Sequence, residues 1–412
     1  MDNSEMSQQP DNQELETTVE MPTGESVVQP FFASEIAEAK ERKIKDCRQG
    51  ERDLVLVNPE AVGINFDQDF IVDSRGSWPL ERCLKYAEDG GKVPDKVMDT
   101  LRSDKAGEFL VSRQADEAKK MSSFREYLAS FEGKLQHARI HPAAETSPVS
   151  PSQAIEHRAD GGFDVVIAQE FIDQLKILSE QTSDLTLVIP FYDHRRGKEN
   201  ASDVPETSEQ IDEYVAICEK IIESFGSEVQ LEIGNETNVS RKSSGEFGEV
   251  LQFASHVDAT EYARFYYEVA TRVKEINPDV KLSISGVACY DPTYLREVLT
   301  EVSRLQAEAG KNTSLVDTIS FHPYTPPGGS PEGGSSEVIG GTIQPLFPTE
   351  LDYKKEIEEM QRLASEFAVK LSVGEINFPS SDPEQHSKLA QSLSLSTKEG
   401  IDSYIYPGVN VH

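Results

Sequence analysis

The segment that decides the fold is Leu231–Asn238, which reads LEIGNETN. Val229 to Ile233 alternates in the manner of a short buried strand; the pattern stops at Gly234, and the side chains that follow are polar. This predicts a strand that carries Asn235 and Glu236 at its carboxyl end. In parallel α/β barrels that end holds the active site, because the loops after the strands are free of packing constraints.

Two other apolar runs end in the same way. Lys370–Asn377 (KLSVGEIN) brings Glu375 directly after a glycine, and Asp317–Tyr324 (DTISFHPY) breaks into His322 and a tyrosine. Glu236 and Glu375 thus form a pair of carboxylates at strand tips. Such a pair is typical of a glycosidase that works through a covalent intermediate.

The remaining pattern alternates strands with helices, and a strand that returns parallel to its neighbour needs such a crossover. We therefore predict a (β/α)8 TIM barrel. The predicted strands are Ala61–Phe66, Leu135–His141, Leu185–Pro190, the run before Asn235, Lys281–Ser285, Asp317–His322, the run before Glu375 and Ile401–Tyr406. The predicted helices are Ala115–Phe131, Asp164–Gln181, the apolar stripe Ile211–Phe225 with a capping box at Thr207 and Gln210, Tyr353–Phe367, and helices that open at Asp258, Asp291 and Asp382.

The chain has 412 residues, more than the roughly 250 of an ordinary (β/α)8 barrel, so we expect one barrel with extensions. Residues 1–50 are expected to form a disordered acidic tail plus a helix at Phe31–Cys47, which would take the place of the eighth barrel helix. Residues 51–412 would form the catalytic barrel. An insertion at 67–114, between the first strand and its helix, contains Trp78 and would hang over the barrel mouth. A Pro- and Gly-rich loop at 326–341 is expected to act as a flap.

The net charge of -33, from 73 acidic and 40 basic side chains, argues against nucleic acid and anionic membranes as partners. The first residues carry no signal-peptide pattern, and no apolar run approaches the roughly 20 residues of a membrane helix, so we expect a cytoplasmic protein. The cysteines form no CxxC pair, which argues against a zinc or redox site, and we expect neither metal nor cofactor. They are Cys47, Cys83, Cys218 and Cys289.

With Arg139 on the second strand, the motifs at 234–236 (GNE), 320–324 (SFHPY) and 374–375 (GE) make the sequence resemble the clan A glycoside hydrolases. These are retaining (β/α)8 enzymes that include cellulases, xylosidases, arabinofuranosidases and the glucuronidase and heparanase group. The resemblance covers strands two to eight, roughly two thirds of the chain. Each motif is weak alone, and their order along the strands carries the resemblance.

The resemblance implies that Glu236 is the general acid/base, that Glu375 is the nucleophile and that Asn235 binds the sugar 2-hydroxyl. The chemistry needs two carboxyl groups about 5 to 5.5 Å apart, one protonated and one charged. Arg139, pointing into the barrel, would lower the pKa of Glu375, and Tyr324 would donate to the same carboxylate. Further candidates for substrate binding are His141, Asp193, His194, His322, Tyr404 and Tyr406.

Two positions depart from the clan pattern. Thr237 stands where the clan commonly has proline, and the eighth strand lacks the usual tryptophan, so Tyr404 or Tyr406 would have to stack on the sugar. These tyrosines alternate with Ile405, and which set of side chains faces inward stays open. With Trp78 as the only tryptophan, a short oligosaccharide or glycoside fits better than a long polysaccharide.

Two other functions stay open at this point. One is a metal-dependent sugar isomerase or epimerase, with Glu236, Glu375, His322 and Asp193 as ligands; the other is a sugar-binding barrel without turnover. The asparagine directly before Glu236 is explained by the glycosidase and not by the isomerase. The sugar, its linkage, exo or endo action and the oligomeric state are not determined by the sequence.

Overall fold

In the computed structural model the chain divides into two compact units, Met1–Lys43 and Ile44–His412, and every described residue belongs to the second. The expected tail and the helix at Phe31–Cys47 therefore lie outside the described residues and stay predictions. The described residues are 62–66, 78–89, 91, 93–129, 135–142, 146–197, 200–238, 257–288, 290–311, 313–323, 337–339, 342–344, 350–377 and 383–406.

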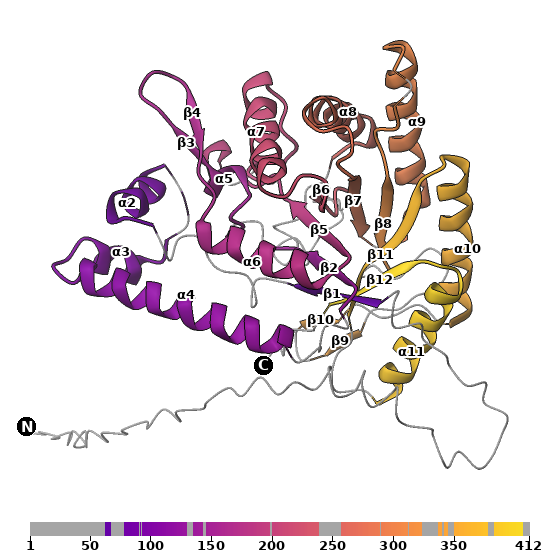
Figure 1. Ribbon diagram of the computed structural model, residues 1–412, viewed down its shortest axis with the longest axis horizontal. Coiled ribbons are helices and arrows are strands. Elements are labelled where there is room, and N and C mark those ends of the chain that lie inside the picture. Colours follow the sequence, from indigo (N-terminus) through magenta and orange to yellow (C-terminus); the bar gives the residue numbers. More distant parts are fainter. Residues whose placement is uncertain are drawn as a thin grey trace, which may run out of the picture. The chain divides into compact units, whose positions relative to one another are not determined.

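The main sheet is a closed barrel of parallel strands, which confirms the predicted (β/α)8 fold (Figure 1). Its first strand pairs with the last strand on one side and with the second strand on the other, and these two pairings close the ring. Around the barrel the order is β1, β12, β11, β8, β7, β6, β5, β2. The strands are β1 Val62–Phe66, β2 His137–Ile140, β5 Asp184–Ile189, β6 Val229–Asn235, β7 Leu282–Ala288, β8 Thr318–His322, β11 Lys370–Asn377 and β12 Asp402–Tyr406.

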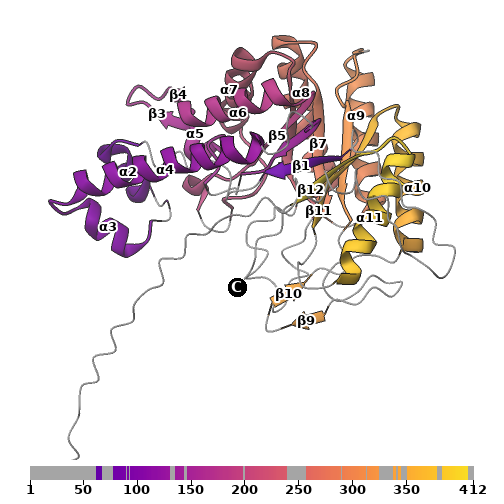
Figure 2. The ribbon, with the colours of Figure 1, turned by 60° about the horizontal axis from the view of Figure 1, so that its bottom comes forward.

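Helices connect successive strands of the barrel and lie outside it (Figures 1 and 2). They are α4 Ala106–Ala129, α6 Gln169–Gln181, α7 Ser208–Phe225, α8 Ala259–Ile276, α9 Pro292–Glu308, α10 Glu350–Glu366 and α11 Pro383–Lys398. The capping box of Thr207 and Gln210 opens α7 as predicted, and Asp258 and Asp291 cap α8 and α9. The described part of the chain has no helix after β12, nor any helix suited in length and apolarity to span a membrane.

Side chains alternate along the strands, so that one set packs outward against the helices and the other fills the barrel interior. On β2 the outward residues Ala138 and Ile140 are fully buried under the helices, while Arg139 points inward and is also buried. On β8 the outward residues are Ile319 and Phe321. The barrel interior can therefore hold polar side chains that the apolar outer layer shields from water.

The connection from β2 to α6 contains a hairpin that we did not predict. It consists of β3 Ile155–His157 and β4 Phe163–Val165, paired antiparallel after the short helix α5 Pro151–Ala154. The predicted helix Asp164–Gln181 therefore begins too early, and α6 starts at Gln169. The reason is local: the stretch 163–166 (FDVV) favours a strand, and Gly161, with φ of 85°, makes the turn.

The described part of the insertion after β1 is mainly helical. It contains α2 Leu80–Glu88 and α3 Asp95–Leu101, and α4 begins at Ala106 and not at the predicted Ala115. The early part of α4 exposes apolar Val111, which obscures the helical pattern. Trp78 is buried in a small cluster between these helices. The other buried members of the cluster are Cys83, Tyr86, Met98 and Leu101.

A second small hairpin follows β8 along the chain. Its strands are β9 Glu337–Ile339 and β10 Thr342–Gln344, paired antiparallel. The expected flap at 326–341 therefore contains a strand at its end, while its residues up to 336 lie outside the described residues.

Candidate active site

The carboxyl ends of four barrel strands bring predicted site residues together. Arg139 comes from β2, Glu236 follows β6, His322 ends β8 and Glu375 lies near the end of β11. Contacts between these side chains, described below, join them into one group. Asn235 and His141 belong to the same group.

Arg139 lies at the centre of this group and is 1% exposed. Its Nη1 donates to Glu375 Oε1 at 2.8 Å, and its Nη2 donates to Asn235 Oδ1 at 2.9 Å. Its Nε and Nη2 also donate to both oxygens of Glu232, at 2.9 and 2.7 Å. The carboxylates of Glu232 and Glu375 raise the pKa of Arg139 against the effect of burial, so the guanidinium stays charged.

Glu232 is a member of this group that the sequence reasoning missed. It is buried and also accepts a hydrogen bond from the backbone N–H of Gly286 at 3.0 Å. A charged residue between Leu231 and Ile233, both apolar and buried, indicates an inward-facing position on the strand. That alternation is the signal that could have identified it.

Glu375 lies among three basic side chains. Besides Arg139, His141 Nδ1 lies 3.2 Å from its Oε1 and His322 Nδ1 lies 3.7 Å from its Oε2. Burial alone would raise the pKa of Glu375, but His322, His141 and Arg139 together hold that pKa well below its ordinary value. Glu375 is therefore ionised at neutral pH.

An irregularity in β11 accompanies this placement. The pairing of β11 with β12 shifts register between Val373 and Ile376, next to Glu375. An added Cβ on Gly374 would meet Ser320 Oγ inside the barrel, so this glycine already faces inward. Strict alternation would turn the next side chain outward, and a bulge of this kind redirects it. The irregularity thus accounts for a glutamate that points into the mouth.

Glu236 adopts an unusual backbone conformation, with φ of 51°. Its N–H donates to Gly286 O at 2.7 Å, which holds the turn. Left-handed backbone at a residue other than glycine costs of order 1–3 kcal/mol and is concentrated at functional sites. Two residues earlier, Gly234 has φ of 84°, and a Cβ there would lie 2.3 Å from the ring of Phe191. Glycine is therefore required at position 234, where the chain leaves the extended strand and turns toward Glu236.

His322 connects the two glutamates. Its Nδ1 lies 2.8 Å from Glu236 Oε1, and the side chain is fully buried. Two glycines make room for the ring, because a Cβ on Gly286 or Gly374 would lie 2.6 or 3.1 Å from Nε2. Burial lowers the pKa of His322, but Glu375 and Glu236 outweigh burial and raise it. Sequence reasoning did not identify the two glycines as the walls of this slot.

The separation of the two glutamates is short. One carboxylate oxygen of Glu236, one of Glu375 and a ring nitrogen of His322 all lie within 4.8 Å of one another. One imidazole and two carboxylates are also a set that binds divalent ions. The guanidinium of Arg139 contacts one of these carboxylates, through Glu375 Oε1.

Asp193 and His194 lie apart from these contacts. Asp193 accepts hydrogen bonds from the backbone and side chain of Arg195, which follows it in the short 3-10 helix η3 His194–Arg196. His194 Nδ1 is hydrogen-bonded to Ser152 Oγ, and its ring lies 4.5 Å from that of Tyr86. Both side chains hold loops together. Asp193 is not part of the group formed by Glu236, His322 and Glu375, so the isomerase hypothesis keeps three of its four expected ligands.

The structure describes the side chain of one of the three candidate tyrosines. Tyr404 is buried, and its ring lies 6.4 Å from that of His137 at the amino-terminal end of β2, away from the barrel mouth. Burial raises its pKa. Tyr324 and the side chain of Tyr406 lie outside the described residues. The structure thus shows where one candidate for sugar stacking lies, and that position is in the barrel core.

No protein-family model and no curated protein matches the sequence. Among solved structures, a monomeric beta-xylosidase from Caulobacter crescentus CB15 is similar over 70% of this chain and 56% of its own, with 14% identity and a TM-score of 0.51. A GH5-4 broad specificity endoglucanase from Clostridium acetobutylicum is similar over 85% and 88%, with 12% identity and a TM-score of 0.44. This chain spans little more than half the length of the xylosidase. The closed barrel and the similarity to the xylosidase show that the chain has a (β/α)8 fold.

Proposed function

We propose that this protein is a retaining glycosidase that hydrolyses the O-glycosidic bond of a short oligosaccharide or glycoside. The observation that supports it best is the approach of Glu236 and Glu375, because one carboxylate oxygen of each lies within 4.8 Å of the other at the barrel mouth. Retaining enzymes hold their two carboxyl groups about 5–5.5 Å apart, whereas inverting enzymes separate them by about 6.5–9.5 Å to admit a water molecule. The short separation favours double displacement.

In the first step Glu375 would attack the anomeric carbon and form a glycosyl ester, while the bond to the leaving oxygen breaks. The lowered pKa of Glu375 supports this role, because the nucleophile must be ionised. Glu236 would give its proton to the leaving oxygen. His322 Nδ1 contacts Oε1 of Glu236, so Oε2 would be the oxygen that acts on the leaving group.

In the second step the Glu236 carboxylate would take a proton from water, and the resulting hydroxide would attack the anomeric carbon and release Glu375. Arg139 and His141 would stabilise the carboxylate that departs from the sugar, since both already contact it. Asn235 accepts from Arg139 through Oδ1, which leaves its NH2 group to donate to the sugar 2-hydroxyl. The same network would therefore fix both the nucleophile and the sugar.

The placement of aromatic residues supports a short substrate. Trp78 is buried among the helices of the insertion, and Tyr404 is buried in the barrel. Neither offers an exposed ring for a sugar, and extended polysaccharide sites depend on such platforms. We infer that few sugar units are bound.

The test is hydrolysis of a panel of nitrophenyl glycosides, with the configuration of the first-formed product followed by NMR. We expect net retention. Glu375→Gly in azide should form a glycosyl azide of inverted configuration, and Glu236→Ala in azide should form one of retained configuration. Glu228→Gln, a change on the exposed residue just before β6, should match the unmodified protein. Normal hydrolysis by both active-site variants would contradict the proposal, as would net inversion.

A further inference from the structure

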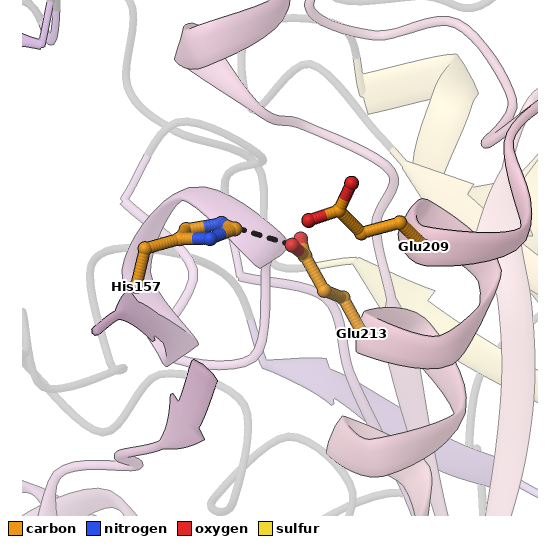
Figure 3. A group of neighbouring side chains, drawn as sticks. All are labelled: His157, Glu209 and Glu213. Carbon is orange, nitrogen blue, oxygen red and sulfur yellow. Dashed lines mark ion pairs between the residues drawn. The ribbon is translucent and has the colours of Figure 1, made fainter. Parts of the chain in front are cut away.

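A second group of ionisable side chains lies outside the proposed active site. It consists of His157 at the end of β3 and of Glu209 and Glu213 in the first turns of α7 (Figure 3). The two glutamates are four residues apart and therefore share one helix face. Figure 3 shows all three side chains pointing toward a common space between the hairpin and the helix.

The distances in this group suit a shared ligand. His157 Nε2 lies 2.9 Å from Glu213 Oε1, and one donor atom from each residue lies within 4.8 Å of the others. Ligands of one tetrahedral zinc ion, each about 2.0–2.2 Å from the metal, lie roughly 3.3–3.5 Å apart. His157 and Glu209 are exposed and free to adjust by the difference.

Glu213 is the fixed member of the group. It is buried, and its Oε2 accepts from Arg195 Nη2 at 2.7 Å. Arg195 is itself held by Asp193 through Nε and Nη2, at 2.7 and 2.8 Å. This chain of contacts leaves Oε1 of Glu213 directed at His157. Metal-binding carboxylates are commonly oriented by such hydrogen bonds to the oxygen that does not bind the metal.

The charges favour a divalent cation. Three carboxylates gather here, those of Glu209, Glu213 and Asp193. Arg195 contacts Asp193 and Glu213, and Lys85 Nζ lies 3.5 Å from the carbonyl oxygen of His157. With a neutral imidazole, these two described cations leave an excess of negative charge. Burial raises the pKa of Glu213, although Arg195 and His157 oppose this effect. A divalent ion would neutralise the excess and favour the ionised carboxylate.

We propose that His157, Glu209 and Glu213 form a binding site for a divalent transition-metal ion, with Zn²⁺ as the best fit, that fastens the β3–β4 hairpin to α7. One imidazole nitrogen with two carboxylate oxygens suits zinc, whereas calcium prefers oxygen alone. Two of the three ligands are solvent-exposed, so a water molecule can complete the tetrahedron. The site is independent of the proposed glycosidase chemistry.

The simpler alternative is an ion pair between protonated His157 and Glu213, with Glu209 as an ordinary acidic residue in the first turn of a helix. The two arrangements differ in their pH dependence. An ion pair needs the imidazolium and weakens as the pH rises, whereas metal binding needs the neutral ring and strengthens.

The experiment is isothermal titration calorimetry of the full chain with ZnCl₂ at pH 7.5 and pH 5.5. We expect binding at pH 7.5, weaker by about tenfold or more at pH 5.5 and in Glu209→Gln. Glu209 is exposed, so its replacement does not threaten the fold. Glu219→Gln, the same change on an exposed face of α7, should bind like the unmodified protein.

Zinc held instead by Glu236, His322 and Glu375 would be lost in Glu236→Gln and kept in Glu209→Gln. That result would overturn the assignment, as would an unmodified chain that binds no zinc at pH 7.5. As a second readout, ZnCl₂ should raise the thermal midpoint of the unmodified chain and of Glu219→Gln, but not of His157→Asn. Equal increases in all of them would also overturn the proposal.

Discussion

Both ends of the barrel place a histidine between two carboxylates. At the carboxyl end His322 Nδ1 lies 2.8 Å from Glu236 and 3.7 Å from Glu375. At the amino end His137 lies 3.4 Å from Asp184 and 3.7 Å from Asp402. Residue types alone therefore do not distinguish the candidate active site from the opposite rim.

The two ends differ in burial and in backbone constraint. The carboxylates of Asp184 and Asp402 are 44% and 38% exposed, whereas that of Glu375 is 10% exposed and lies against buried Arg139. Among the residues that the structure describes, only the carboxyl end combines a buried carboxylate with three backbone features. These are the left-handed backbone of Glu236, the register shift in β11 and the two glycines that leave space for the His322 ring. The comparison teaches that rigid, water-poor surroundings distinguish the end that holds the candidate active site.

The largest expected difference between the ends is in catalysis. Glu375→Gln keeps the shape of the side chain but removes the proposed nucleophile, and should lower kcat/KM on a nitrophenyl glycoside by roughly four orders of magnitude or more. Asp402→Asn, the matched change at the amino end, should leave the rate within about twofold, since exposed pairs contribute little. A large loss of activity in Asp402→Asn with a native fold would remove the distinction between the ends.

Stability should show the next largest difference. Arg139→Met leaves the buried carboxylates of Glu232 and Glu375 without their common partner. Loss of one partner from a buried ion pair costs about 3–5 kcal/mol. Lys281→Met removes a cation beside Asp184 at the amino end, where both side chains are nearly half exposed, and should cost at most about 1 kcal/mol. Urea denaturation measures both, and equal costs would show that burial does not separate the two ends.

The glycine slot allows a finer test. In Gly286→Ala the new Cβ would lie 2.6 Å from His322 Nε2, which should displace the ring from Glu236. A displacement near 1 Å costs about 10²-fold in rate. Gly107→Ala is the control: a Cβ there meets nothing within 4 Å, and alanine in that helix should stabilise by about 0.5–1 kcal/mol. Unchanged kcat in Gly286→Ala would show that the position of His322 does not matter.

The smallest expected effect is a slope in stability with pH. Because the pKa of Glu375 is lower in the folded chain than its ordinary value, its contribution is present above about pH 4.3 and is lost as the pH falls below that. The free energy of unfolding should therefore decline less between pH 5 and pH 3 in Glu375→Gln than in the unmodified chain. His137 also lowers the pKa of Asp184, but that carboxylate is exposed, so Asp184→Asn should change the slope less. A larger change for Asp184→Asn would contradict the comparison.

The barrel was predictable because its strands follow strong local rules. Runs such as Lys281–Ser285 combine alternation of side chains with a polar end. Asp258 and Asp291 are N-cap residues, which predict the start of the helices that follow. The β3–β4 hairpin and the start of α4 were missed because short hairpins and helices with exposed apolar residues such as Val111 carry weak periodicity.

The site was predictable only in part. Strand tips identify Arg139, Glu236 and Glu375, because polar residues there have no packing role to explain them. Local sequence does not report which inward side chain meets which, so Glu232 and the His322 slot were missed. For the same reason Tyr404 was expected at the mouth but packs against His137, and Asp193 was expected to bind the sugar but is held by Arg195.

The closure of the barrel by β1 and β12 has a consequence for the synthesis of the protein. Val62 to Ile64 pair with Ser403 to Ile405, so one side of an early strand waits for a partner made near the end of translation. At about 5–20 residues per second that wait lasts on the order of 20 to 70 s. During this interval the ribosome-bound chain presents an open edge, which is the situation in which chaperones bind nascent proteins.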